Sequence, residues 1–246
     1  MSDETGDWVR GLRIVITGAA GVFGVGLVEE AVRQGAHVVA TGREPTISAA
    51  PLPDGVNRIA ADLADPKQCR DLITRAADVL GGIDVLINNA ALLTNRLIVD
   101  LDESDLESSW AVNVRAPVLL TQRAVPFLER SNAASVINVV SAAGVTGGVA
   151  PVSAYAMSKA ALIVFTKAAA RELGPRGIRV VAVSPPTMES QMQSALDIEF
   201  RKTVRSMSVL GRVPTVEEAA RVTLFAASPH AAALTGTMID VTAAVV

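Results

Sequence analysis

The chain has 246 residues and a net charge of −3, with 50% hydrophobic but only 3% aromatic residues. This length suits one α/β domain spanning residues 1–246, and the lack of a basic block argues against nucleic-acid binding. Cys69 is the only cysteine, which excludes an internal disulfide and a cysteine metal cluster. The acidic N-terminus is unlike a signal peptide, and no uncharged apolar run reaches about 18 residues, so we expect a soluble, cytoplasmic protein without a membrane span.

Short β-branched runs alternate with longer helix-like segments along the chain. We expect strands at Leu12–Thr17, His37–Thr41, Arg58–Ala61, Val85–Asn88, Ser135–Val140, Arg179–Ser184 and Met238–Val241. We expect helices near Gly24–Gln34, Pro66–Leu80, Glu103–Arg130, Ala154–Leu173 and Thr215–Ala227. This alternation predicts βαβ units and an α/β fold, a Rossmann-like doubly wound parallel sheet of about seven strands with helices on both faces.

Two stretches lack a regular pattern. Glu44–Asp54 contains three prolines and predicts a loop. Thr187–Leu210 contains three methionines and predicts a mobile segment that covers a substrate. Met188, Met192 and Leu196 suggest an apolar pocket there, but they do not define the substrate.

A glycine-rich turn follows the first expected strand, where Gly18, Gly21 and Gly24 lead into a helix that also contains Phe23. Glycines let the backbone approach a pyrophosphate closely, and the helix N-terminus offers free N–H groups and the positive end of its dipole. A turn at this place therefore predicts a dinucleotide site.

The end of the second expected strand indicates which dinucleotide binds. A carboxylate there would accept hydrogen bonds from the ribose of NAD(H), but the chain has Thr41-Gly42-Arg43 instead. The guanidinium of Arg43 could pair with a 2′-phosphate. The sequence therefore favours NADP(H) over NAD(H).

Tyr155, the only tyrosine, stands four residues before Lys159. In a helix this spacing places both side chains on one face. An ammonium beside a phenol favours the phenolate, so we expect the pKa of Tyr155 to be lowered from its usual value of about 10. Such a phenol could transfer a proton near neutral pH.

These residues, in this order, resemble the short-chain dehydrogenase/reductase family in its single-domain form of about 250 residues, and the match runs from Gly11 to Thr242. The further motifs that carry the resemblance are Asp62-Leu63, Asn88-Asn89-Ala90-Ala91, Asn113, Ser141, Pro185 with Ser190, Gly211–Glu218 and Leu234-Thr235-Gly236. The resemblance implies hydride transfer between nicotinamide and a carbonyl or secondary alcohol.

The resemblance also implies roles for single residues. Ser141 would bind the substrate oxygen and Tyr155 would transfer the proton. Lys159 would lower the pKa of the tyrosine and bind the nicotinamide ribose, and Asn113 would hold a water that relays protons. The implied cofactor contacts are Gly18, Gly21, Phe23, Gly24, Arg43, Asp62, Leu63, Asn89, Ala90, Tyr155, Lys159, Pro185 and Ser190.

Some positions depart from the family pattern. Val22, Ala91 and Pro186 replace glycines, and Thr242-Ala243-Ala244 replaces Asp-Gly-Gly. The spacing of Gly18, Gly21 and Gly24 is similar to a longer, epimerase-type branch. Two alternatives therefore stand beside an oxidoreductase: an epimerase or dehydratase that uses bound NAD(P) transiently, and a cofactor-binding protein with reduced catalysis.

The expected partners are a small carbonyl or alcohol substrate and further copies of the chain. The apolar run Thr237–Val246 and the long segment Glu103–Arg130 predict a homo-oligomer, a tetramer or a dimer. His37 and His230 lack a carboxylate pattern around them, so we expect no metal site.

Overall fold

The protein was analysed as a computed structural model, which describes residues 6–148, 151–186, 206 and 208–243. Seven strands form one all-parallel sheet in the order β3-β2-β1-β4-β5-β6-β7. The strands are β1 Arg13–Thr17, β2 His37–Gly42, β3 Asn57–Ala60, β4 Val85–Asn88, β5 Ser135–Val139, β6 Arg179–Ser184 and β7 Met238–Asp240. The predicted fold class is confirmed.

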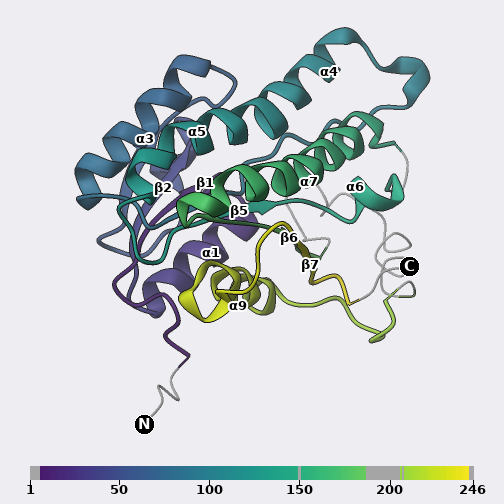
Figure 1. Cartoon of the computed structure of the whole chain (residues 1–246). Helices are drawn as coiled ribbons and strands as arrows, with labels where there is room; N and C mark the ends of the chain where they lie inside the picture. The colour runs from purple at the N-terminus through teal and green to yellow at the C-terminus, as the bar shows by residue number, and fades with distance from the viewer. Residues whose placement is uncertain (1–5, 149–150, 187–205, 207, 244–246) are drawn as a thin grey trace.

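Helices cover both faces of the sheet (Figure 1). The α-helices are α1 Val22–Arg33, α2 Thr46–Ala49, α3 Pro66–Leu80, α4 Glu103–Trp110, α5 Ala116–Leu128, α6 Ala143–Thr146, α7 Ser153–Leu173 and α9 Val216–Ala227. A π-helical turn, η2 Ala111–Arg115, joins α4 to α5, and three short 3₁₀ turns lie at Ile98–Asp100, Gly174–Arg176 and Pro229–Ala231. Helices α1 and α9 lie together on one face, whereas α3, α5 and α7 lie on the other.

The core has one apolar layer on each side of the sheet. On one side Leu27 of α1 and Leu224 of α9 pack against β-strand residues such as Ile87. On the other side Leu72 of α3 and Leu120 of α5 pack against the alternate strand residues, whose side chains point to this face of the sheet. Every residue of β4 and β5 is buried, because helices cover these central strands on both faces.

Local chemistry explains where the helices begin. Asp65 accepts a hydrogen bond from the N–H of Lys67 at the start of α3, with Pro66 in the first helical position. Asp102 forms a capping box with Asp105 at the start of α4, and Thr215 forms one with Glu218 at the start of α9. By contrast, α1 begins at Gly21 without a side-chain cap.

A charged cluster occupies the amino-terminal ends of the strands. The guanidinium of Arg13 donates to both carboxylate oxygens of Asp84 at 2.7 and 2.8 Å, and the hydroxyl of Ser131 donates to Asp84 at 2.6 Å. Burial alone would raise the pKa of Asp84, but the hydrogen bonds from Arg13 and Ser131 together hold that pKa below its usual value. The third donor group of Arg13 reaches the carbonyl of Gly81 at 2.7 Å. Every charge in this cluster is thus paired.

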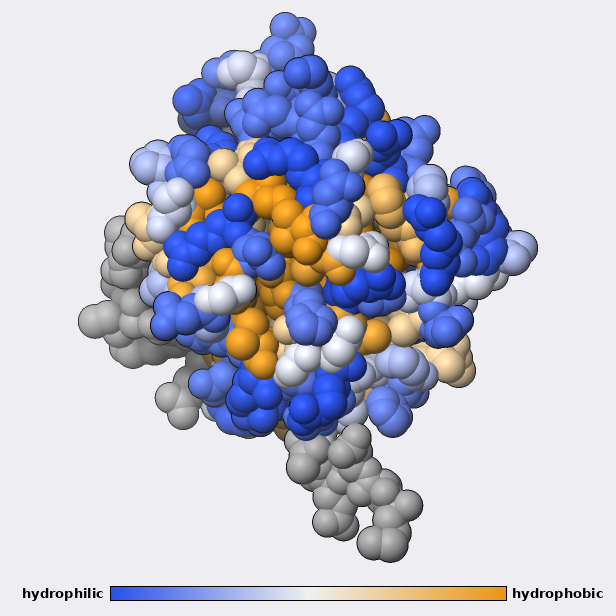
Figure 2. Space-filling view, turned by 90° about the vertical axis from the view of Figure 1, so that its left-hand side faces the viewer, coloured by the Kyte–Doolittle hydropathy of each residue, from blue (hydrophilic) through white to orange (hydrophobic). Residues whose placement is uncertain are grey.

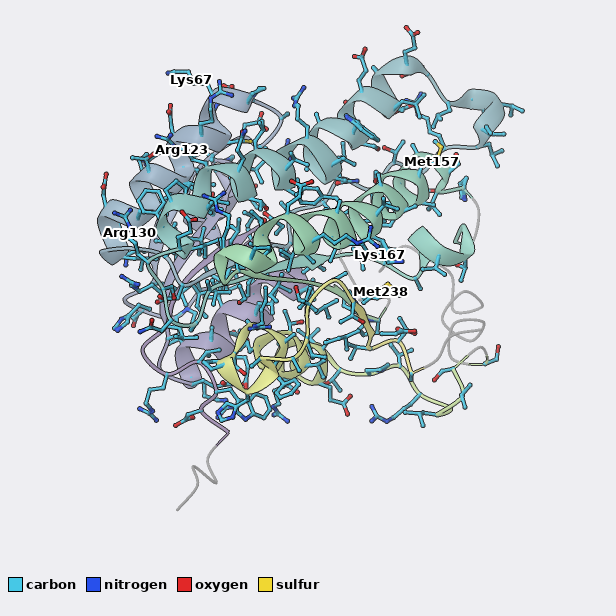
Figure 3. All side chains as sticks on the ribbon, viewed as in Figure 1. Lys67, Arg123, Arg130, Met157, Lys167 and Met238 are labelled. Atoms are coloured by element: carbon cyan, nitrogen blue, oxygen red, sulfur yellow. The ribbon has the colours of Figure 1, made fainter. Side chains whose placement is uncertain are left out.

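Figure 2 shows the face at the left of Figure 1, where apolar side chains gather inside a polar rim. A hollow of about 290 Å³ is lined by Arg13, Phe127 and Arg130 among others. Figure 3 places Arg130 at the left, far from Met157 in the first turns of α7. Because Arg13 begins β1 and Gly81 and Gly82 precede β4, the hollow lies at the end of the sheet opposite the glycine-rich turn.

The structure differs from the sequence expectations in detail. The helix expected over Glu103–Arg130 is interrupted by the π turn η2, and the loop expected over Glu44–Asp54 contains the short helix α2 and a cis bond between Glu44 and Pro45. Strand β7 ends one residue earlier than expected. Within the described residues, no helix is both long and apolar enough to span a membrane.

Candidate active site

The sheet reverses its strand order between β1 and β4. In an open parallel sheet, ligands bind beyond the carboxyl ends of the strands at such a switch point. The turn after β1, the segment after β4 and the residues after β5 all emerge at this edge. This edge holds most of the residues that the sequence singled out.

Two of the three glycines in the turn after β1 are required by the fold. Gly18 has φ +64°, and a Cβ there would lie 2.6 Å from Cα of Ala90. A Cβ on Gly24 would lie 2.2 Å from the carbonyl oxygen of Gly18. Gly21 differs, because its φ is −77° and its Cβ would meet only the Gly18 oxygen, at 3.5 Å. Packing does not demand glycine at position 21.

The first turn of α1 fits the diphosphate of a dinucleotide. Since no side chain caps this helix, the backbone N–H groups after Gly21 are free to bind an anion. Phe23 is only 7% exposed and its side chain lies in the core, so it could meet a cofactor only through its backbone. Val22, 40% exposed, stands where the family pattern has glycine.

Thr17 and Asn89 lock the turn to the segment after β4. The hydroxyl of Thr17 accepts hydrogen bonds from the N–H groups of Asn89 at 2.9 Å and Ala90 at 3.0 Å. The side-chain amide of Asn89 donates to the carbonyls of Thr17 at 2.8 Å and Gly18 at 3.1 Å. Asn89 therefore braces the turn. Thr17 was not predicted as a site residue, although its place directly before Gly18 was a signal.

Arg43 lies exposed at the end of β2, and its side chain forms no ion pair within the described residues. The loop behind it is held by Arg58 of β3, which donates to the carbonyls of Ile47 at 3.2 Å and Ser48 at 2.7 Å. The N–H of Ile47 in turn donates to the carbonyl of Arg43 at 2.9 Å. The backbone of Arg43 is thus fixed while its guanidinium faces solvent.

Asp62 and Leu63 follow β3 at the same edge. One oxygen of the exposed Asp62 accepts the N–H of Ala64 at 2.9 Å, which forms an Asx turn. The side chain of Leu63 is 7% exposed and belongs to the core. Leu63 could therefore meet a cofactor only through its backbone.

Ser141, Tyr155 and Lys159 come together beyond β5. The side chain of Ser141 lies near the phenol of Tyr155 and acts on its pKa. The ammonium of Lys159 is fully buried, donates to the carbonyl of Val139 at 2.7 Å, and lies 5.6 Å from the centre of the Tyr155 ring. Gly144 permits this arrangement, because a Cβ there would lie 2.8 Å from the backbone of α7.

The expectation that Lys159 lowers the pKa of Tyr155 was wrong. Burial raises the pKa of Tyr155, and the nearby hydroxyl of Ser141 opposes that shift only in part. Burial also lowers the pKa of Lys159 to about 8. Both shifts favour the uncharged forms, because the two groups lie in an apolar environment.

Asn113 lies in the middle of the π turn η2 and is 0% exposed. Its side-chain oxygen accepts the N–H of Leu92 at 2.7 Å. Its amide donates to the carbonyl of Leu92 and to the hydroxyl of Ser158, each at 2.9 Å. Both amide hydrogens are therefore used inside the protein, and the side chain has no donor left for the predicted water. Ser158, next to Lys159, was missed because a serine inside a helix is usually a surface residue.

The remaining predicted contacts lie partly outside the described residues. Pro185 directly follows β6 at the carboxyl edge, next to the buried hydroxyl of Ser184. Ser190 and the methionines at positions 188 and 192 lie outside the described residues, as does Leu196. Among the residues that are described, no group of three His, Cys, Asp or Glu side chains could hold a metal ion.

Comparisons with known proteins show the family of this chain. A family model described as enoyl-(acyl carrier protein) reductase matches residues 18–243. The 3-oxoacyl-[acyl-carrier-protein] reductase FabG of Thermotoga maritima is 34% identical over 239 residues, which cover 95% of this chain and 97% of that protein. A short-chain dehydrogenase of Burkholderia cenocepacia in complex with NADP is 28% identical, with a TM-score of 0.86 over 97% of this chain and 99% of that one. The RhlG/NADP active-site complex of Pseudomonas aeruginosa is 25% identical, with a TM-score of 0.87 over 98% of each chain.

Proposed function

The chain belongs to the short-chain dehydrogenase/reductase family and is an NAD(P)-dependent oxidoreductase of carbonyl or alcohol groups; we propose that it reduces a carbonyl group with NADPH and that Tyr155 supplies the proton. The observation that carries this proposal is the meeting of Ser141, Tyr155 and the buried ammonium of Lys159 beyond β5, at the carboxyl edge where the glycine-rich turn also lies. A hydroxyl and a phenol side by side suit one substrate oxygen, which gains negative charge as the carbonyl is reduced.

The cofactor, when bound, supplies the hydride. The N–H groups at the start of α1 would hold its diphosphate, with the turn kept in shape by Thr17 and Asn89. The exposed guanidinium of Arg43 would meet a 2′-phosphate, and the free oxygen of Asp62 would meet the adenine. The backbones of Ala90 and Pro185 lie at the same edge and would complete the cradle, with Ser190 as a further proposed contact.

The protein's own groups would move the proton. Ser141 donates a hydrogen bond to the substrate oxygen, and Tyr155 gives its proton to that oxygen. Because burial raises the pKa of Tyr155, the phenol is protonated at neutral pH and ready to act as an acid. The ammonium of Lys159 stabilises the phenolate that remains, and Asn113 holds the segment after β4 against α7.

A spectrophotometric screen tests this function. The purified protein should oxidise NADPH, followed at 340 nm, with a panel of ketones that includes ethyl acetoacetate and acetoacetyl-CoA. Crotonyl-CoA serves as the control, because it offers a C=C bond in place of the ketone. Reduction of crotonyl-CoA but of no ketone would contradict carbonyl reduction.

The preference for NADPH depends on Arg43. The variant Arg43→Ala should raise KM for NADPH by roughly tenfold, the loss of one charge-assisted contact, and change KM for NADH by much less. The neighbouring Arg58 is not suitable as a control position, because a substitution such as Arg58→Lys would disturb the loop behind Arg43. A native preference for NADH that persists in Arg43→Ala would remove the argument.

We also propose a homo-oligomer. Trp110 of α4, Met157 and Val164 of α7 leave 55%, 56% and 65% of their surfaces exposed, which is costly for apolar side chains of this size. β7 completes one edge of the sheet, so the described part of the terminal run is held within the chain. Light scattering at micromolar concentration should give a multiple of 25.5 kDa, and a single-chain mass would contradict the oligomer.

A further inference from the structure

Hydrogen bonds connect the segment after β4 with the turn of α7 that carries Tyr155. Leu92 is held at both its N–H and its carbonyl by the side chain of Asn113. Asn113 continues to the hydroxyl of Ser158 at 2.9 Å, and that hydroxyl reaches the carbonyl of Tyr155 at 2.7 Å. Ser158 is the last link in this connection, and the reaction scheme gives it no role.

The direction of each bond is fixed by chemistry. The amide nitrogen of Asn113 can only donate, so the oxygen of Ser158 accepts from it. The single hydrogen of Ser158 therefore points to the carbonyl of Tyr155, three residues earlier in the same helix. Asn113 is 0% exposed and Ser158 is 2% exposed, so water cannot replace either partner.

The connection has functional consequences because its two ends belong to different parts of the site. Ala90, two residues before Leu92, packs against Gly18 of the glycine-rich turn and is bound by Thr17. At the other end, the extra bond to the carbonyl of Tyr155 constrains the first turns of α7. A shift in this turn would move the phenol relative to whatever is bound over the glycine-rich turn.

We propose that Ser158 is a positioning residue that sets the place of the Tyr155 phenol relative to the nucleotide side of the site. This proposal rests on the proposed function, because it assumes that Tyr155 gives the proton. Ser158 does not touch the phenol. It acts through Asn113 and the backbone of Tyr155.

Ser158→Ala removes the link and leaves one buried N–H of Asn113 without a partner. We expect kcat with NADPH and the best ketone of the panel to fall on the order of tenfold, because small misplacements of a reacting group cost this much or more. KM for NADPH should stay within about twofold, because the contacts proposed for the diphosphate and the 2′-phosphate, at the start of α1 and at Arg43, are not altered. The solvent deuterium isotope effect on kcat should rise, since proton transfer becomes more limiting.

Ser228→Ala is the matched control. The hydroxyl of Ser228 donates to the carbonyl of Phe225 at 2.8 Å, again three residues earlier in a helix, and the residue is 0% exposed. It lies at the end of α9, in the layer on the other face of the sheet. Ser228→Ala should lower the melting temperature about as much as Ser158→Ala while leaving kcat and the isotope effect unchanged.

Two further variants decide between the outcomes. Ser158→Cys keeps a weak donor and acceptor and should give an intermediate kcat, which also covers the case in which Ser158→Ala does not fold. Tyr155→Phe, assayed in parallel, tests the underlying function. Native kcat in Ser158→Ala or Ser158→Cys beside an inactive Tyr155→Phe would overturn the proposal for Ser158 alone. Native kcat in Tyr155→Phe would overturn the proposed function and the Ser158 proposal with it.

Discussion

Charged groups lie at both ends of the sheet, but the two ends differ in whether these charges have partners of opposite charge. At the amino-terminal ends, Arg13 and Asp84 pair through two side-chain hydrogen bonds, and Ser131 and Gly81 satisfy their remaining groups. At the carboxyl-terminal ends, Lys159 is buried completely with only the carbonyl of Val139 as hydrogen-bond partner, and no salt bridge of Lys159 occurs in the described part of the chain. A paired charge becomes costly when its partner is removed, whereas an unpaired buried ammonium is costly in the native fold itself.

This difference indicates which end of the sheet contributes to stability and which end contributes to catalysis. In the amino-terminal cluster, the hydrogen bonds from Arg13 and Ser131 hold the pKa of Asp84 down and keep its carboxylate charged. At the carboxyl-terminal ends burial makes the charged form of both groups less favourable: it raises the pKa of Tyr155 and lowers the pKa of Lys159 to about 8, as is common at functional sites. Changes at one end should therefore affect the free energy of unfolding, and changes at the other should affect kcat.

The largest expected effect is that of Tyr155→Phe on turnover. Loss of the proton donor should lower kcat by roughly 10²- to 10⁴-fold, while the free energy of unfolding changes by about 1 kcal/mol or less. Initial rates at 340 nm and urea unfolding of the same preparation measure both quantities. A variant that keeps native turnover would show that the phenol is not the acid.

Asp84→Asn should have the reverse effect. It leaves Arg13 without a negative partner, and because Arg13 is partly exposed we expect a loss of about 2 to 3 kcal/mol in the free energy of unfolding. The kcat of the folded protein should not change. Urea unfolding checks the first part, and a fall in kcat would show that the two ends are coupled.

Lys159→Met should make the stability depend less on pH. The pKa of Lys159 is about 8 in the folded protein and about 10.5 when unfolded, so the unfolded chain binds more protons between these values. The native protein therefore gains stability relative to Lys159→Met as pH rises from about 8 to 10.5, by up to about 3 kcal/mol. Urea unfolding at pH 7 and pH 10 measures this, and a difference between the two proteins that does not vary with pH would contradict burial of the ammonium.

Substitutions of Gly24 and Gly21 in the turn after β1 should have smaller effects. They should distinguish a glycine that the fold requires from one that ligand binding requires. Gly24→Ala forces a Cβ to within 2.2 Å of the Gly18 oxygen and should cost about 1 to 3 kcal/mol of stability. Gly21→Ala should change stability by less than about 0.5 kcal/mol, yet weaken NADPH binding, because the added methyl group would stand directly before the N–H groups proposed to hold the diphosphate. Fluorescence titration with NADPH checks the second variant, and native affinity would mean that position 21 is not near the cofactor.

The sequence predicted the fold because β-branched runs and glycine-rich turns are local signals. It missed α2 and α6, since four-residue helices show no periodicity, and it missed the π turn around Asn113, since one extra residue does not break an apolar stripe.

The site was predicted less completely. The spacing of Tyr155 and Lys159 correctly indicated that their side chains lie close together. The burial that raises the pKa of Tyr155 comes from the packing of the whole fold around it, which the spacing does not report. Thr17 binds backbone N–H groups of the segment after β4, and Ser158 binds the side-chain amide of Asn113, which lies 45 residues away in the sequence. The sequence pattern did not identify these long-range partners.

The most direct measurement combines both regions in one double variant, Asp84→Asn with Tyr155→Phe, compared with the two single variants. If one end of the sheet provides stability and the other provides catalysis, the double variant should unfold like Asp84→Asn and turn over like Tyr155→Phe. The free-energy changes should add to within about 0.5 kcal/mol, as they do for independent sites. A larger departure from additivity, or a loss of kcat in Asp84→Asn alone, would contradict this division.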